Sequence, residues 1–123
     1  MAVILLVEDD LLIRSCAEMM IQDGGHTTLA ASDVAEALAF IDSSQHIDAL
    51  MTDIRLKTAI NGGYELARQA IQLRPSLRVL YATGSSITDK IKALCVDGAH
   101  FIQKPYSEEQ LRQSVDELLA VSS

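Results

Sequence analysis

Side chains that could do chemistry follow four apolar segments of this chain at the points where those segments end. In chain order they are Glu8 and Asp9, Asp53, Thr83, and Lys104. In an open parallel sheet the carboxyl ends of the strands lie along one edge, where ligand sites form. The sequence therefore predicts that acids, a hydroxyl and an amine converge on one site.

Three carboxylates at one site would repel one another and raise each other's pKa. A hard divalent cation removes that conflict, and Mg²⁺ typically takes one or two carboxylates together with a phosphate. Asp53 has the additional property that an aspartate carboxylate can attack phosphorus to form an acyl phosphate. The negative charge of the transferred group would be neutralised or hydrogen-bonded by Mg²⁺, Lys104 and Thr83. The residue types thus favour magnesium-dependent phosphoryl chemistry.

The elements that must position these residues follow a regular alternation. Apolar runs predict strands at residues 2–7, 27–31, 47–51, 77–82 and 99–103, and amphipathic patterns predict helices at 10–23, 33–41, 64–73, 87–96 and 107–120. Such alternation is typical of a parallel sheet joined by right-handed crossovers. We therefore expect an α/β fold, a doubly wound five-stranded parallel sheet with helices on both faces.

Helix boundaries and inward faces can also be predicted. Asp33 with Glu36, and Ser107 with Gln110, have the spacing of capping boxes. The residues 61–63, Asn-Gly-Gly, indicate a turn before the third helix. The apolar stripes expected to face the core are Leu12, Cys16, Met19 and Met20 in the first helix, Leu66, Ala70 and Leu73 in the third, and Ile91, Leu94 and Cys95 in the fourth.

Length and charge limit the classes of function. A chain of 123 residues suits one domain with a single core. Its formal net charge of −7, without a basic stripe, argues against nucleic acid as a direct partner. Tyr64, Tyr81 and Tyr106 are too dispersed along the sequence for a base-stacking platform.

The compartment can be inferred from what the sequence lacks. No apolar run reaches the roughly 18 residues that a transmembrane helix needs, and the start has no basic flank of a signal peptide. Cys16 and Cys95 are far apart in helical patterns, which favours free thiols in a reducing compartment. These features predict a cytoplasmic protein without a membrane partner.

Five short motifs together resemble the receiver (CheY-like) domain of two-component response regulators. They are Leu6–Asp10, Thr52-Asp53, Gly63–Leu66, Ala82–Gly84 and Lys104–Tyr106. Each is weak alone, but their order and spacing across nearly the whole chain are specific. The resemblance implies a flavodoxin-like (βα)₅ fold with strand order 2-1-3-4-5. It also implies that residues 1–123 form a single receiver domain without an output domain.

The resemblance also implies roles for the site residues. Asp53 would be the phosphoacceptor, labelled by a histidine kinase or a phosphotransfer protein. Mg²⁺ would be held by Asp53, by Asp9 directly, by Glu8 mainly through water, and by the backbone carbonyl of Arg55. Lys104 would pair with the phosphate. The domain would catalyse only its own phosphorylation and dephosphorylation.

Further family features concern the switch and the output. Thr83 would be the switch hydroxyl, and Phe101 the coupled aromatic residue on the last strand. The Lys104–Pro105 peptide bond is expected to be cis. A downstream protein partner would bind the surface formed by the fourth helix, the fifth strand and the fifth helix.

The chain departs from the family pattern at three places. Lys57 stands where the family often has proline, and the loop between Asp53 and Gly63 is longer than usual. Arg55 puts a bulky cation two residues after Asp53, a position that tunes phosphoryl lifetime in the family. Ser85 and Ser86 give a small, polar entry to the fourth helix.

Two alternatives remain open at this point. The first is a pseudo-receiver, an interaction module of the same fold that signals without phosphate and would not bind magnesium. The second is an enzyme, either a small aspartate-nucleophile phosphohydrolase or a flavin-binding flavodoxin relative. Against it, Arg55 occupies the position of the hydrolases' second acid, and the acids Glu8–Asp10 would repel a flavin phosphate.

Overall fold

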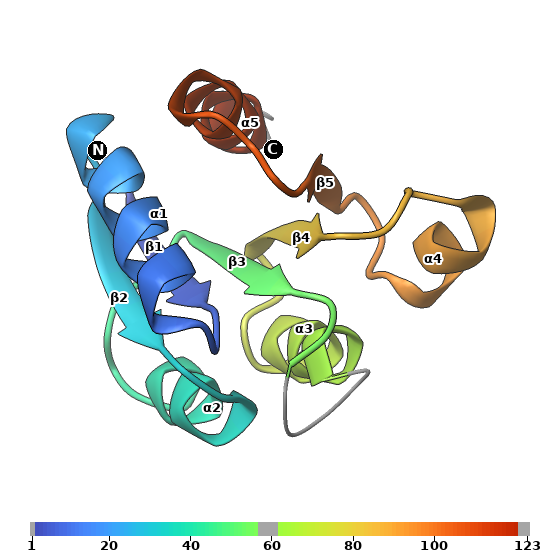
Figure 1. The fold of residues 1–123 in the computed structure, drawn as a ribbon. Coiled ribbons are helices and arrows are strands. Elements are labelled where there is room, and N and C mark those ends of the chain that lie inside the picture. Colours follow the sequence, from blue (N-terminus) through green and yellow to red (C-terminus); the bar gives the residue numbers. More distant parts are fainter. Residues whose placement is uncertain (1, 57–61, 121–123) are drawn as a thin grey trace.

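The computed structural model describes residues 2–56 and 62–120. Ten elements alternate between strand and helix (Figure 1). They are β1 (Val3–Val7), α1 (Leu11–Asp23), β2 (Thr27–Ala31), α2 (Val34–Ile41), β3 (Ala49–Asp53), α3 (Gly62–Leu73), β4 (Arg78–Thr83), α4 (Asp89–Leu94), β5 (His100–Gln103) and α5 (Glu108–Ala120).

The strands form one parallel five-stranded sheet in the order β2-β1-β3-β4-β5, as predicted. The central strands β1 and β3 are buried on both faces, which is why their sequences are almost uninterrupted apolar runs. Leu6 pairs with Met51 and Val7 with Thr52. This register brings the residues that follow β1 next to the end of β3.

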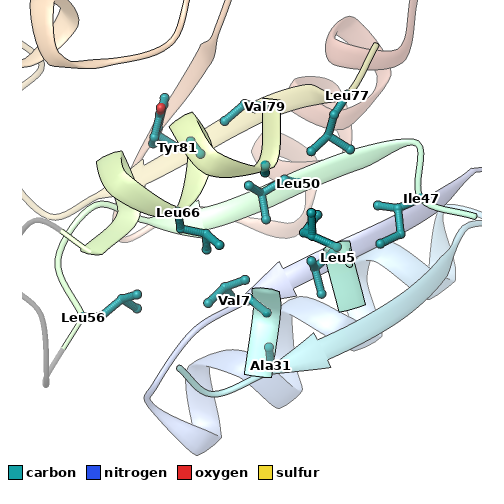
Figure 2. Packing of buried hydrophobic residues seen from close by; sticks show 14 of the residues in the cluster. Leu5, Val7, Ala31, Ile47, Leu50, Leu56, Leu66, Leu77, Val79 and Tyr81 are labelled. Atoms are coloured by element: carbon teal, nitrogen blue, oxygen red, sulfur yellow. The ribbon is translucent and has the colours of Figure 1, made fainter. Parts of the chain in front are cut away.

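Two apolar layers cover the two faces of the sheet. Leu5 and Val7 of β1 face the layer of α2 and α3, whereas Ile4 and Leu6 face the layer of α1 and α5. The alternation follows from the two-residue period of a strand. Figure 2 shows the first layer, in which Leu66 of α3 packs over the sheet near Leu5, Val7 and Leu50. Helix α4 lies beside β4 and β5 (Figure 1), and its Ile91 packs, partly buried, against the layer of α2 and α3.

Side chains cap several of the helices. Asp10 Oδ1 accepts a hydrogen bond from the Ile13 N–H and so starts α1 directly after the acids of the site. The capping box predicted at Ser107 and Gln110 is confirmed, since each side chain bonds the other residue's backbone N–H. Asp33 Oδ1 likewise accepts from the Glu36 N–H at the start of α2.

The predicted inner face of the first helix is wrong for three of its four residues; the fourth, Met20, is half-buried against the layer of α1 and α5. Leu12 is 76% exposed, Met19 is 64% exposed, and Cys16 is also exposed. The residues of α1 that are buried are Ala17 and Ile21, four positions apart. With 3.6 residues per turn, Leu12, Cys16 and Met19 lie on the side of the helix opposite Ala17 and Ile21, so they face away from the sheet. An exposed apolar surface on α1 is the consequence.

Other boundaries and faces also differ from the prediction. Helix α3 begins at Gly62 rather than Tyr64, and α4 spans only Asp89–Leu94. Leu73 and Leu94, predicted to face the core, are 56% and 57% exposed because each lies at a helix end beyond the sheet. Lys57 and most of the long loop fall at positions 57–61, outside the described residues. Among the described residues, no helix is long and apolar enough to cross a membrane.

Candidate functional site

Asp53 lies at the C-terminal end of β3 and is only 5% exposed. Since β1 is the neighbour of β3, Glu8 emerges beside it and is similarly buried. The hydroxyl of Thr52 donates to the Asp53 carbonyl, and the Ile54 N–H donates to the Ala82 carbonyl of β4. The backbone on both sides of the Asp53 side chain is therefore fixed.

Lys104 follows β5 and reaches both acids. Its Nζ lies 2.6 Å from Asp53 Oδ1 and 2.9 Å from Glu8 Oε1. The Lys104 N–H also donates to the Thr83 carbonyl, which fixes the lysine's backbone to the end of β4. The following Lys104–Pro105 peptide bond is cis, as the sequence suggested. A half-buried ammonium thus bridges two buried carboxylates.

Glu8, Asp9 and Asp53 form a compact acidic cluster. Each offers a carboxylate oxygen, and these oxygens all lie within 4.8 Å of one another. Glu8 Oε2 accepts the Asp10 N–H, so Glu8 is held in place from its own loop. All the donors are hard oxygen atoms, which is the ligand type that Mg²⁺ prefers. The donor set therefore fits a magnesium ion.

The titration behaviour of the two buried acids differs. Burial, and then the adjacent Glu8, raise the pKa of Asp53 to about 8, and Lys104 opposes this only in part. Burial acts to raise the pKa of Glu8 too. Its hydrogen bonds with Asp53, the Asp10 N–H and Lys104 outweigh burial and hold the pKa at about 2. Burial and the charge of Glu8 thus disfavour the ionised form of Asp53, whereas Lys104 favours it.

The two predicted switch residues occupy different surroundings. Thr83 follows Ala82, the register partner of Asp53, and is buried. Its Oγ1 accepts the Ser85 N–H at 3.1 Å, so the hydroxyl is used by the turn after β4. Phe101 of β5 is half-buried and stacks on Tyr81, with ring centroids 5.7 Å apart.

Two residues, Arg14 and Gly63, support the site in ways that the sequence did not predict. Arg14 of α1 donates from its guanidinium to the Glu8 carbonyl at 2.8 Å, which ties the acidic loop to the helix. Gly63 lies against the Asp53 carbonyl and donates its own N–H to Ile54. Arg14 follows the cap residue Asp10 by one helical turn, and this spacing is a signal that could have found it. The Arg55 side chain is exposed.

The fold and the acidic cluster with its lysine define a class of signalling domain, and comparison with known proteins gives the family. A family model described as "Response regulator receiver domain" matches residues 4–116. The chain therefore belongs to the receiver domains of two-component response regulators, the family of phosphoacceptor signalling switches.

Curated relatives agree with this family. The chain is 33% identical over 113 residues to the uncharacterized transcriptional regulatory protein YrkP of Bacillus subtilis, covering 91% of this chain and 47% of the relative. It is 30% identical over 122 residues to the transcriptional regulatory protein PhoP of Escherichia coli K12, covering 98% and 53%. The chain thus spans about half the length of these relatives.

Solved structures show the same architecture. A response regulator receiver protein from Sinorhizobium medicae superposes with a TM-score of 0.88 at 28% identity, covering 98% of this chain and 95% of the other. The chemotaxis response regulator CheY4 of Vibrio cholerae gives a TM-score of 0.84 at 26% identity, covering 97% and 99%.

Proposed function

We propose that Asp53 is the residue that accepts the phosphoryl group. The observation that carries this proposal is the ion pair of Lys104 with both Asp53 and Glu8. A lysine held 2.6 Å from Asp53 Oδ1 supplies positive charge where phosphoryl oxygens would arrive. Lys104 contacts both acids, and Asp53 is the nearer of the two, at 2.6 Å against 2.9 Å for Glu8.

Phosphorylation would require Mg²⁺, held by Asp53, by Asp9, by Glu8 through water and by the backbone carbonyl of Arg55. The ion would neutralise charge on the carboxylates and on the transferred group. The compact set of oxygen donors supports this assignment. Lys104 remains beside Asp53 Oδ1 and stabilises the ionised form that attacks phosphorus.

The donor would be a phosphohistidine of a histidine kinase or a phosphotransfer protein. The P–N bond breaks as the bond between phosphorus and the Asp53 carboxylate forms, and the donor's imidazole takes up a proton. The product is an aspartyl phosphate. This domain would catalyse only that transfer and its own later hydrolysis.

Thr83 would then change partners. Its hydroxyl, bonded to the Ser85 N–H in the unphosphorylated domain, would turn to a phosphoryl oxygen. The turn after β4 would lose that bond, and the change would pass with Phe101 to the surface of α4, β5 and α5. A downstream protein would bind this surface. Such a local charge event biasing a two-state element is a general form of switching.

The donor would dock on the exposed apolar surface of α1. Leu12 and Ile13 line a groove of about 290 Å³ together with Lys104, Pro105 and Tyr106. Because Lys104 lines the groove and also contacts Asp53, a protein bound to this surface would lie next to Asp53. Exposed apolar patches of this kind mark interaction sites.

The first experiment is an intact-mass measurement after incubation with acetyl phosphate, with and without Mg²⁺. Wild type should gain one phosphoryl adduct only when Mg²⁺ is present, Asp53→Ala should gain none, and the exposed-acid variant Asp42→Ala should behave as wild type. An adduct on Asp53→Ala would refute the acceptor assignment.

A magnesium titration separates the receiver from the pseudo-receiver. Calorimetric Mg²⁺ binding that is lost in Asp9→Ala supports the receiver. No binding to wild type, together with no adduct, would favour an interaction module that signals without phosphate.

The cellular setting is part of the same proposal. The proposal concerns the receiver domain alone, since the relatives are about twice as long as this chain. We propose that the domain acts in the cytoplasm through protein partners rather than by contact with nucleic acid. Its net charge of −7 and the free thiols of Cys16 and Cys95 support this setting.

A further inference from the structure

Helix α4 is less buried against the rest of the domain than the other helices are. None of its residues 89–94 is buried, whereas α1, α2, α3 and α5 each bury at least two. The segment after it, Cys95–Ala99, returns the chain to β5. At the start of this segment the Val96 N–H donates a hydrogen bond of 3.2 Å to the Tyr81 hydroxyl.

Tyr81 is a rigid anchor for that hydrogen bond. It is a central residue of β4 with 0% exposure, and its ring stacks on Phe101 and lies against Tyr64 at a centroid distance of 6.1 Å. Figure 2 shows the hydroxyl directed away from Leu50 and Leu66 of the core. Burial raises the pKa of Tyr81 to about 12, so the hydroxyl stays protonated at physiological pH.

The same strand carries Thr83. Residues two apart on a strand point to the same face, so Tyr81 and Thr83 are neighbours on one side of β4. Tyr81 pairs in register with Phe101, and Thr83 with Gln103. The end of α4 is thereby connected to the strand end at the acidic site through one side chain.

We propose that Tyr81 is a positioning residue whose hydroxyl latches the C-terminal end of α4 to β4. While this hydrogen bond is present, a displacement of β4 at Thr83 also displaces the C-terminal end of α4. Without it, β4 can move and the end of α4 can stay where it is. The latch itself is a property of the unphosphorylated fold. Only its part in transmission rests on the proposed function.

The first test is amide hydrogen exchange by NMR on the magnesium-free protein. In Tyr81→Phe, which keeps the ring and removes the hydroxyl, the Val96 amide should exchange about tenfold faster, while core amides of β1 and β3 keep their wild-type rates. Tyr64→Phe removes a hydroxyl from the neighbouring ring and should leave Val96 within about twofold of wild type. An unchanged Val96 rate in Tyr81→Phe, or equal acceleration in both variants, would overturn the latch.

A second variant keeps the proposal testable if Tyr81→Phe does not fold. Val96→Pro removes the donor instead of the acceptor, and the preceding Cys95 has the extended conformation (φ −90°, ψ 158°) that a following proline favours. The amides of Asp97 and Ala99 should then exchange faster than in wild type. Wild-type rates at both positions would contradict the latch.

Transmission is tested with beryllofluoride and Mg²⁺ as a phosphoryl analogue. The chemical-shift response of the α4 amides should fall by at least half in Tyr81→Phe, although its acetyl phosphate adduct forms as in wild type. A full α4 response in this variant would refute the transmission role. If wild type neither responds nor forms an adduct, the proposed function fails, while the exchange experiment still decides the latch.

Discussion

Gly63 of α3 packs directly against the backbone carbonyl of Asp53. A Cβ atom at Gly63 would lie 2.7 Å from the Ile54 Cα and 2.9 Å from the Asp53 carbonyl carbon. Since these contacts are all with backbone, no side chain could turn away to make room. The first turn of α3 and the end of β3 therefore fit together only with glycine at this position.

Gly63→Ala should lower the free energy of unfolding by about 2 kcal/mol or more and weaken magnesium binding, because the end of β3 must shift. Gly84→Ala is the matched control, since an added Cβ there meets no atom within 4 Å. It should change stability by no more than about 0.5 kcal/mol. Urea denaturation and magnesium titration of both variants measure this, and equal stability of the two would contradict the packing argument.

Lys104→Gln should have opposite effects on stability and on magnesium binding. In the absence of Mg²⁺, the substitution removes the positive charge beside Asp53 and Glu8. The free energy of unfolding should therefore fall by about 1–3 kcal/mol. Its Mg²⁺ affinity should rise several-fold, because the ammonium no longer competes for the same carboxylates. Phosphorylation by acetyl phosphate should become slower.

The control for this experiment is Lys92→Gln on the exposed side of α4, which should match wild type in all three measurements. Weaker Mg²⁺ binding by Lys104→Gln would mean that the lysine organises the acids more than it competes with the ion.

Asp53→Asn should stabilise the magnesium-free domain, and more so as the pH rises. The folded pKa of Asp53 is raised from 3.8 to about 8, so its stabilising proton is present at low pH and lost as the pH rises through 8. Between pH 3.8 and 8 this group lowers the free energy of unfolding of wild type by at most about 1.4 kcal/mol per pH unit. The asparagine variant has no such pH-dependent loss. Unfolding curves of both proteins at about pH 5, 6.5 and 8 measure the difference between their free energies of unfolding. A constant difference across these pH values would contradict the raised pKa.

Leu12→Ser should slow phosphotransfer from a histidine kinase that labels wild type by about tenfold, because it removes an apolar contact of the donor. Labelling by acetyl phosphate should be unchanged, since Asp53 is untouched. Leu73→Ser changes another exposed leucine, at the end of α3 remote from Asp53, and should leave both rates at wild type. Equal slowing with both phosphodonors would show damage to the site rather than to docking.

Much of the fold and of the acidic cluster could be predicted because the order of apolar and polar residues along the sequence marks where each strand ends. Apolar runs ending in polar residues located the strand ends, and the strand order implied by the family resemblance then placed Glu8 beside Asp53, as the structure confirms. The proximity of Lys104 followed from the same logic. These inferences needed only the strand order and a common edge.

The remaining features depend on how the elements pack. Helix α1 buries Ala17 and Ile21 against the sheet, so Leu12 and Met19 are exposed although they lie on an apolar pattern. The bond from Val96 to Tyr81 spans 15 residues and two different elements, and no local pattern marks it. The hydroxyl of Thr83 could be located near the site from the sequence, but not its bond to Ser85.

The ion pair between Lys104 and Glu8 joins residues 96 positions apart in the sequence. During synthesis the carboxylates of β1 and β3 leave the ribosome well before the lysine that neutralises them. The sheet can begin to assemble from these strands, but its acidic edge lacks its ammonium until β5 has been added. Competence for phosphorylation would therefore arise in this domain only after β5 has been made, and only in molecules whose sheet is complete.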